Sequence, residues 1–182
     1  MYKLEFDIAQ QINPQNIPCD GVDIVVCLSG RGTFSHTIHV ADGNKLKRNT
    51  NDLDPDDTYR RFSFAVKIAR EQTLLNQRLG LNKPVVLYFN GVEEQNIQLR
   101  TLLKKHKTLL GYPTEHIVVD DILMDNTVGQ CIGLRLYLES TVEKFGHSPK
   151  LLFVSIAFQI NISEFMRLIN GDKIQRAITL PV

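Results

Sequence analysis

Polar and glycine residues follow four short apolar runs, at the points where the strands of a predicted sheet would end. Ser29-Gly30-Arg31-Gly32 follows the first run, Asn90-Gly91 the second, Asp120-Asp121 the third and Ser155 the fourth. Glycine lets a backbone approach a ligand closely, arginine binds an anion through paired hydrogen bonds, and a carboxylate accepts from a ligand hydroxyl. These residue types predict a site for a small polar ligand.

The same residues also have a structural interpretation. Gly30 and Gly32 are ordinary turn residues, and Asn126 is a suitable cap for a helix that begins near Thr127. The two glycines are not followed by the third glycine of a dinucleotide-binding fingerprint, and the absence of a Gly-Lys-Ser/Thr sequence excludes a P-loop. The binding and the structural interpretations both stay open.

Two further groups of residues indicate no additional site. His36 and His39 lie three residues apart, but neither Asp42 nor any other residue supplies a third ligand at a distinctive spacing, so we predict no bound metal. The basic run Lys104–Lys107 lies near the end of a predicted helix. Lysines there interact favourably with the helix dipole, which indicates a solvated face.

The candidate nucleophiles are weak. Ser155 lacks the Gly-x-Ser-x-Gly turn of a hydrolase. Cys27 falls within an apolar run and Cys131 within a predicted helix, positions typical of packing cysteines. With Cys19 the chain has three cysteines, which cannot all pair, and this favours a reduced, cytoplasmic protein.

Five apolar runs and four amphipathic segments must position these residues. We expect strands at about 23–28, 84–89, 116–119 and 150–154, and a weaker strand at 177–180. The first is continuously apolar, as in a central parallel strand covered on both faces. Helical periodicity covers about 58–80, 93–110, 127–146 and 162–169. This alternation predicts an α/β fold, a Rossmann-like three-layer sandwich with a mainly parallel central sheet.

The 182 residues predict one α/β domain over 1–182, in which residues 29–57 form a long loop that could close as a lid. A formal net charge of +1 argues against a nucleic-acid-binding surface. No apolar run approaches the roughly 18 residues of a membrane span, and the first residues lack the apolar stretch of a signal peptide. We therefore expect a small-molecule ligand, and neither a membrane nor a nucleic acid as partner.

The order of these pieces resembles the bacterial YdcF/SanA/ElyC family, a Rossmann-like domain of unknown function. The resemblance rests on the Gly30 and Gly32 pair, an arginine at 60 or 61, Asn90-Gly91 with Glu94, Gly111-Tyr-Pro113, Asp121, Asn126-Thr127 and the stretch from Val154. The chain departs from the family pattern where Gln130 replaces an asparagine, Gln159 a histidine and Ile162 an arginine. Glutamine forms hydrogen bonds but moves no proton near neutral pH. The chain therefore resembles a divergent member of that family.

The resemblance implies a nucleoside- or nucleotide-like ligand such as S-adenosylmethionine. The predicted ligand-binding residues are Gly30, Arg31, Gly32, Asn90, Gly91, Glu94, Asp121, Asn126, Thr127, Ser155 and Gln159. Three functions stay open: a small-molecule-binding domain, a transferase or hydrolase that acts on a nucleotide or phosphorylated small molecule, and a degenerate family member that serves protein interaction.

Overall fold

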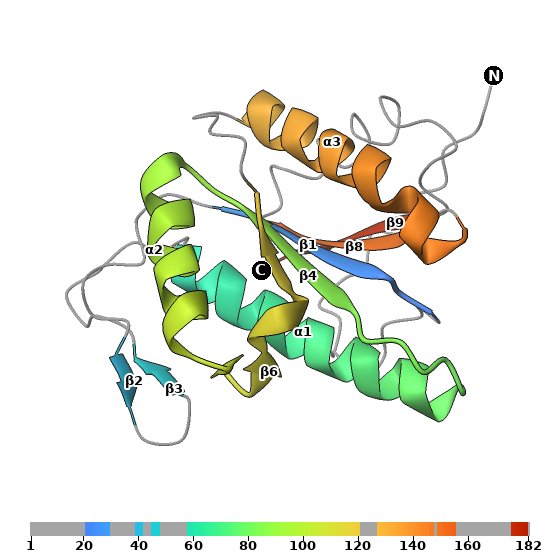
Figure 1. Cartoon of the computed structure of the whole chain (residues 1–182), viewed down its shortest axis with the longest axis horizontal. Helices are drawn as coiled ribbons and strands as arrows, with labels where there is room; N and C mark the ends of the chain where they lie inside the picture. Colours follow the sequence, from blue (N-terminus) through green and yellow to red (C-terminus); the bar gives the residue numbers. More distant parts are fainter. Residues whose placement is uncertain are drawn as a thin grey trace.

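The structure, a computed structural model, describes residues 21–29, 39–41, 45–47, 58–120, 127–147, 149–155 and 176–181 (Figure 1). Within these residues, the centre is a parallel sheet of five strands in the order β7-β4-β1-β8-β9. The strands are β1 (Ile24–Leu28), β4 (Val86–Asn90), β7 (Ile117–Val119), β8 (Lys150–Ser155) and β9 (Arg176–Pro181). The predicted α/β fold is confirmed, including the central place of β1 and the weaker fifth strand.

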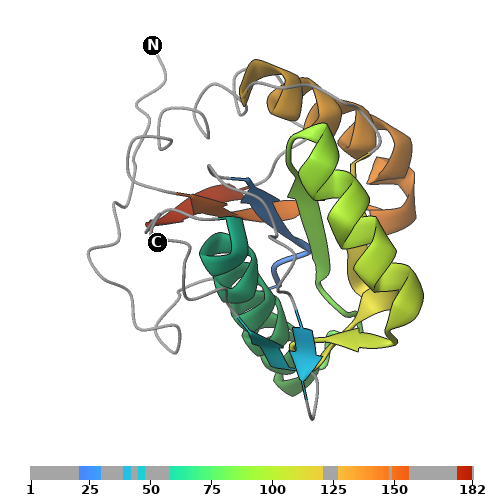
Figure 2. The ribbon, with the colours of Figure 1, turned by 90° about the vertical axis from the view of Figure 1, so that its left-hand side faces the viewer.

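In the described part of the chain, three helices cover the sheet: α1 (Thr58–Arg78), α2 (Glu93–Lys105) and α3 (Thr127–Phe145). Alternate side chains of each strand point to opposite faces. Val25 and Cys27 of β1 join a core with residues of α1 and α2, whereas Ile24, Val26 and Leu28 pack with residues of α3. Figure 2 shows α1 and α3 on opposite sides of the sheet. All five residues of β1 are buried, which explains its unbroken apolar sequence.

The segment after α2 differs from the prediction. The apolar pattern predicted a helix to residue 110, but α2 ends at Lys105, and a hairpin of β5 (Thr108–Leu109) and β6 (Tyr112–Pro113) follows. Leu110 and Gly111 both have positive φ, 50° and 73°, as a two-residue hairpin turn requires. The hairpin buries Leu109 and Tyr112 in the core beneath α1, and this burial outweighs continued helix.

Between β1 and α1 the structure describes two short strands, β2 (His39–Ala41) and β3 (Lys45–Lys47), which pair antiparallel. They form a ladder separate from the central sheet, beside the lower end of α2 in Figure 1. Residues 30–38, 42–44 and 48–57 of the predicted loop lie outside the described residues, so the lid stays a prediction. The helix expected at 162–169 also lies outside them.

Candidate functional site

The carboxyl ends of three neighbouring strands bring polar residues to one edge of the sheet. Ser29 follows β1, Asn90 ends β4 and Asp120 follows β7. The Ser29 amide donates to the Asn90 carbonyl at 2.9 Å, and the Asp120 amide donates to the Phe89 carbonyl at 3.0 Å. These backbone bonds hold the three residues at the same level, although they are far apart in sequence.

The order of the strands in the sheet reverses beside β1, the strand that Ser29 follows. From β1 it adds β4 and β7 on one side, and then returns to add β8 and β9 on the other side of β1. The switch therefore lies between β1 and β8, and the crevice outside such a switch is where open α/β sheets bind their ligands. The predicted loops after Leu28 and Val154 leave the sheet at these two strands.

One side chain from α3 joins the ends of β1 and β4. Gln130 Nε2 donates to Ser29 Oγ and to the Asn90 carbonyl, each at 3.0 Å. Gln130, Ser29, Asn90 and Asp120 are all buried, with exposed fractions of 7% or less. We call these four residues the edge cluster.

A carboxylate fixes the orientation of the Asn90 side chain. Asn90 Nδ2 donates to Asp120 Oδ2 at 2.7 Å, and the Tyr88 hydroxyl donates to the same oxygen. Burial raises the pKa of Tyr88 well above its ordinary value, and the neighbouring Asp120 raises it further. The tyrosine therefore stays protonated as a donor. Asn90 Oδ1 is buried and has no hydrogen-bond partner among the described residues. Exchanging the amide nitrogen and oxygen would place the oxygen against the carboxylate.

A buried arginine supports the edge cluster from the α1 side of the sheet. Arg61 Nη1 donates to the Ser29 carbonyl at 3.0 Å and to the Leu28 carbonyl at 3.4 Å. These two carbonyls lie at the end of the central strand, so the guanidinium fixes the point where the chain leaves β1. The resemblance left open whether Arg60 or Arg61 matches the family's arginine. Arg61 lies at the end of β1, and the side chain of Arg60 is outside the described part of the structure.

Two of the predicted site residues after β4 have other roles. The Gly91 amide donates to Asn96 Oδ1 at 2.9 Å, and Asn96 Nδ2 returns a bond to the Gly91 carbonyl at 3.1 Å. The Gly91 backbone thus holds the start of α2. Glu94 is exposed on the first turn of α2, where it accepts from Gln98 Nε2 at 3.2 Å, so it lies outside the edge cluster.

Most of the remaining predicted residues lie outside the described part of the chain. Thr127 is the first residue of α3 and Ser155 the last of β8, and only their backbones are described. The predicted residues whose structure is not described are Gly30, Arg31, Gly32, Asp121, Asn126 and Gln159. Their places in a common crevice stay a prediction.

Residue types alone did not identify Tyr88, Asp120 and Gln130 as parts of one cluster. Tyr88 lies within an apolar run, and its hydroxyl becomes informative only once Asp120 is beside it. The acidic pair at 120–121 was a usable signal, but the residue that follows β7 directly is Asp120. Gln130 appeared only as a departure from the family pattern, yet it bridges two strand ends.

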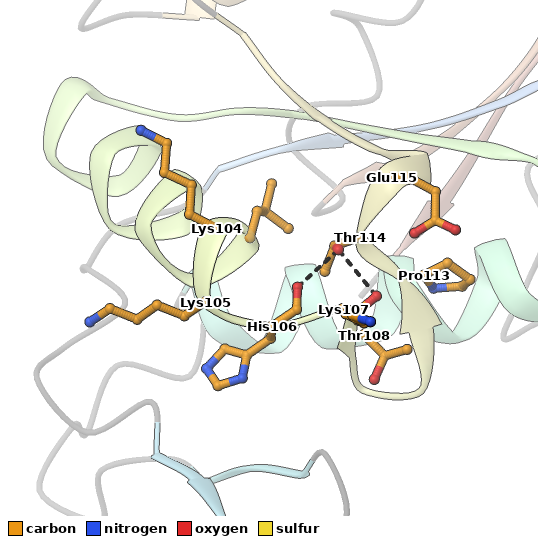
Figure 3. A pocket seen from close by; sticks show the side chains of 9 residues that line it. Lys104, Lys105, His106, Lys107, Thr108, Pro113, Thr114 and Glu115 are labelled. Carbon is orange, nitrogen blue, oxygen red and sulfur yellow. Dashed lines mark hydrogen bonds between the residues drawn. The ribbon is translucent and has the colours of Figure 1, made fainter.

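The basic run at the end of α2 does not converge on a site. A hollow of about 610 Å³ lies between this run and the β5–β6 hairpin. Figure 3 shows Lys104 and Lys105 extending away from Glu115, which lies on the other side of the hollow. Thr114, the residue after the hairpin, donates from Oγ1 to the carbonyls of His106 and Lys107 at 3.0 and 3.1 Å and so holds the segment that follows α2.

The described residues contain no helix both long and apolar enough to cross a membrane. In the same part of the chain, no three side chains of metal-ligand type come together. Cys27 and Cys131 are buried free thiols. In comparisons with family models, with curated proteins and with solved structures, nothing matches this chain.

Proposed function

We propose that this chain is a small-molecule-binding Rossmann-like domain whose ligand, of nucleoside or nucleotide type, sits at the carboxyl edge of the sheet near the switch between β1 and β8. One observation carries the proposal. Three neighbouring strand ends and the first turn of α3 contribute buried polar side chains to that edge. Gln130 bonds to Ser29 and Asn90, and Asn90 bonds to Asp120. Polar groups at the carboxyl edge of an open α/β sheet, beside its switch point, are typical of ligand sites.

The state of Asn90 supports a ligand that donates a hydrogen bond. A buried acceptor without a partner costs about 1–3 kcal/mol, and a donor from a ligand or an ordered water removes that cost. Because Asp120 holds the amide nitrogen, Asn90 presents an oxygen and not an N–H at its other end. Hydroxyl and amino groups of a nucleoside are donors of this kind.

The composition of the edge cluster favours binding over catalysis as the leading hypothesis. The cluster supplies two amides, a hydroxyl and one carboxylate, and that carboxylate already accepts from Tyr88 and Asn90. Membership of the YdcF-type family, S-adenosylmethionine as the ligand and a cytoplasmic location are parts of the same proposal. They rest on the resemblance and on the cysteine count.

A thermal-shift screen of the full chain tests the proposal. The panel contains nucleosides, nucleotides, S-adenosylmethionine and inorganic phosphate. A ligand at about 100 times its Kd adds about 2.7 kcal/mol of stability, which raises the Tm of a chain of this size by roughly 5–10 °C.

Gln130→Leu should reduce that ligand-induced shift, because it removes both bridging hydrogen bonds from the edge. Gln98→Leu is the matched control and should keep the full shift, since the Gln98 side chain bonds to Glu94 on the surface of α2 and takes no part in the edge cluster. The proposal fails if no nucleoside or nucleotide raises the Tm, or if Gln130→Leu responds as the unaltered chain does.

A further inference from the structure

A basic surface lies at the end of α2, around the hollow beside the β5–β6 hairpin. Lys104 and Lys105 belong to the last turn of the helix, and Lys107 follows the helix. All three side chains are exposed, and with His106 and Glu115 they line the hollow of about 610 Å³. We call Lys104, Lys105 and Lys107 the lysine surface.

The positive charge of the lysine surface is not balanced by acidic neighbours. Within the described part of the chain these lysines form no ion pair, whereas Lys83 and Arg135 each pair with an acidic side chain. Of the described residues that line the hollow, only Glu115 is acidic, and Figure 3 shows Lys104 and Lys105 extending away from it. The formal net charge of +1 for the whole chain therefore conceals a local excess of positive charge.

The dipole of α2 accounts for part of this surface. A positive charge is favourable in the last turn of a helix, where two of the lysines lie, but the effect falls off beyond that turn. Lys107 lies past the C-cap residue His106. Arg70 of α1 donates to the Leu110 carbonyl at 3.2 Å and so brings a further positive charge to the turn of the hairpin. Positive charge thus continues beyond the region that the helix dipole favours.

The arrangement of the lysines favours an extended anionic partner over a small anion. Figure 3 shows the side chains of Lys104 and Lys105 pointing in different directions, so their ammonium groups do not enclose one ligand. Leu103 and Pro113 add apolar surface to the lining of the hollow. A polypeptide can offer several carboxylates along its length and an apolar side chain between them, which matches both features.

A nucleic acid fits the same surface less well. Single strands are usually bound through aromatic stacking, and phosphates through paired hydrogen bonds from arginine. The described lining of the hollow contains no phenylalanine, tyrosine, tryptophan or arginine. Tyr112 of the hairpin is buried, and its hydroxyl donates to the Val85 carbonyl. The composition of the surface therefore favours carboxylates over a nucleic acid.

We propose that the lysine surface docks an acidic segment of a partner protein, whose carboxylates pair with the three ammonium groups while an apolar side chain lies in the hollow against Leu103 and Pro113. Each exposed ion pair is weak, so the segment needs several carboxylates, and the binding depends strongly on salt. Residues 113–115 of the lining come shortly before the start of β7, so the surface lies at the amino edge of the sheet. It is therefore separate from the edge cluster at the carboxyl edge.

Fluorescence anisotropy with labelled peptides and the full chain tests the inference at neutral pH. The probe is a short peptide of glutamates around a central leucine, and its neutral counterpart has glutamine in place of each glutamate. At low salt the acidic peptide should bind about tenfold or more tightly than the neutral one, because several weak pairs add together. At about 1 M salt, where the Debye length is about 3 Å, this preference should disappear.

A second peptide tests the hollow. Replacing the central leucine of the acidic peptide with glycine should weaken binding by about threefold to tenfold, because the apolar part of the hollow then stays uncovered. A single-stranded oligothymidylate of the same charge as the acidic peptide is the nucleic-acid probe, and it should bind more weakly than the peptide.

Charge reversal locates the peptide on the chain. Lys105→Glu should weaken binding of the acidic peptide by about threefold to tenfold, because it replaces an attractive pair with a repulsive one. Lys144→Glu is the matched control, since Lys144 is an exposed lysine in the last turn of α3, which packs on the opposite face of the sheet from α2. It makes the same change of charge at a helix end and should keep the Kd within about twofold, as expected for a distant, screened charge.

Equal affinity for the acidic and neutral peptides at low salt would overturn the inference, as would tighter binding of the oligothymidylate. Equal effects of Lys105→Glu and Lys144→Glu would show that the peptide responds to net charge and does not dock at this surface. An unchanged Kd for the peptide without leucine would likewise contradict the proposed place of the apolar side chain.

Discussion

The Asp120 carboxylate packs against the backbone of Gly133 in α3. It occupies the space that a β-carbon would take if any other amino acid stood at position 133. A β-carbon at position 133 would overlap Asp120 Oδ2 and stand 2.8 Å from Asn90 Nδ2. The absence of one side chain on the helix thus allows a buried carboxylate to sit between β7 and α3. It also makes the edge cluster depend on one position of the helix.

Gly133→Ala should therefore lower the free energy of unfolding by about 1–3 kcal/mol, the usual cost of overpacking a filled core. Alanine at an unhindered site within a helix would instead stabilise the chain by about 0.5–1 kcal/mol, so the sign of the change is informative. Urea unfolding followed by circular dichroism measures it.

The double variant Gly133→Ala/Asp120→Ala is the control for this cause. Removing the carboxylate makes room for the new methyl group, so the double variant should lose less stability than the two single variants added together. Additive losses would show that the two residues do not interact as the structure indicates.

At the amino edge of the sheet, Asp23 joins the starts of several elements. Its side chain accepts from Lys83 Nζ, from the Lys150 amide at 2.8 Å, and contacts His147 Nε2 at 3.0 Å. Asp23→Ala should lower the free energy of unfolding by about 2–4 kcal/mol, because it leaves the Lys150 amide without this acceptor and removes the contacts with Lys83 and His147.

Lys83→Ala is the matched control. The Lys83 side chain is about a third exposed, so its pairing is worth only about 0–1 kcal/mol. Equilibrium unfolding in urea compares the two variants. A loss in Lys83→Ala as large as that in Asp23→Ala would contradict the central role of the aspartate.

Cys27 gives a prediction for alkaline pH. Burial raises the pKa of its thiol from 9.0 to about 12, although the nearby Arg61 acts in the opposite direction. The native thiol therefore stays protonated where the unfolded thiol ionises. Its contribution to stability is complete below pH 9 and is lost as the pH rises from 9 to 12, by about 1.4 kcal/mol at pH 10.

Cys27→Ala removes this titration, so the stability of the variant should fall less steeply than that of the unaltered chain between pH 9 and pH 10. The comparison uses urea unfolding at a series of pH values. Parallel curves for the two proteins would show that the Cys27 thiol titrates alike in the folded and unfolded states.

The sequence by itself determined where most of the elements lie. The continuous apolar run before Ser29 predicted a central strand, and β1 is buried along its whole length. The helices that begin at Thr58, Glu93 and Thr127 follow the predicted ranges at their starts. Such features depend on residues two to four positions apart, whose side chains share one face of a strand or a helix, so the pattern of neighbours is enough to find them.

Only the tertiary structure decided which residues meet. Ser29 and Gln130 are 101 residues apart, and their hydrogen bond exists because β1 pairs with β4 while α3 packs over both. The hairpin at 108–113 replaced the last turn of a predicted helix because Tyr112 and Leu109 gain burial beneath α1. Asp120 joins Tyr88 and Asn90 because adjacent parallel strands bring alternate residues to the same face. The pairing of strands distant in the chain sets these contacts, and no local periodicity encodes it.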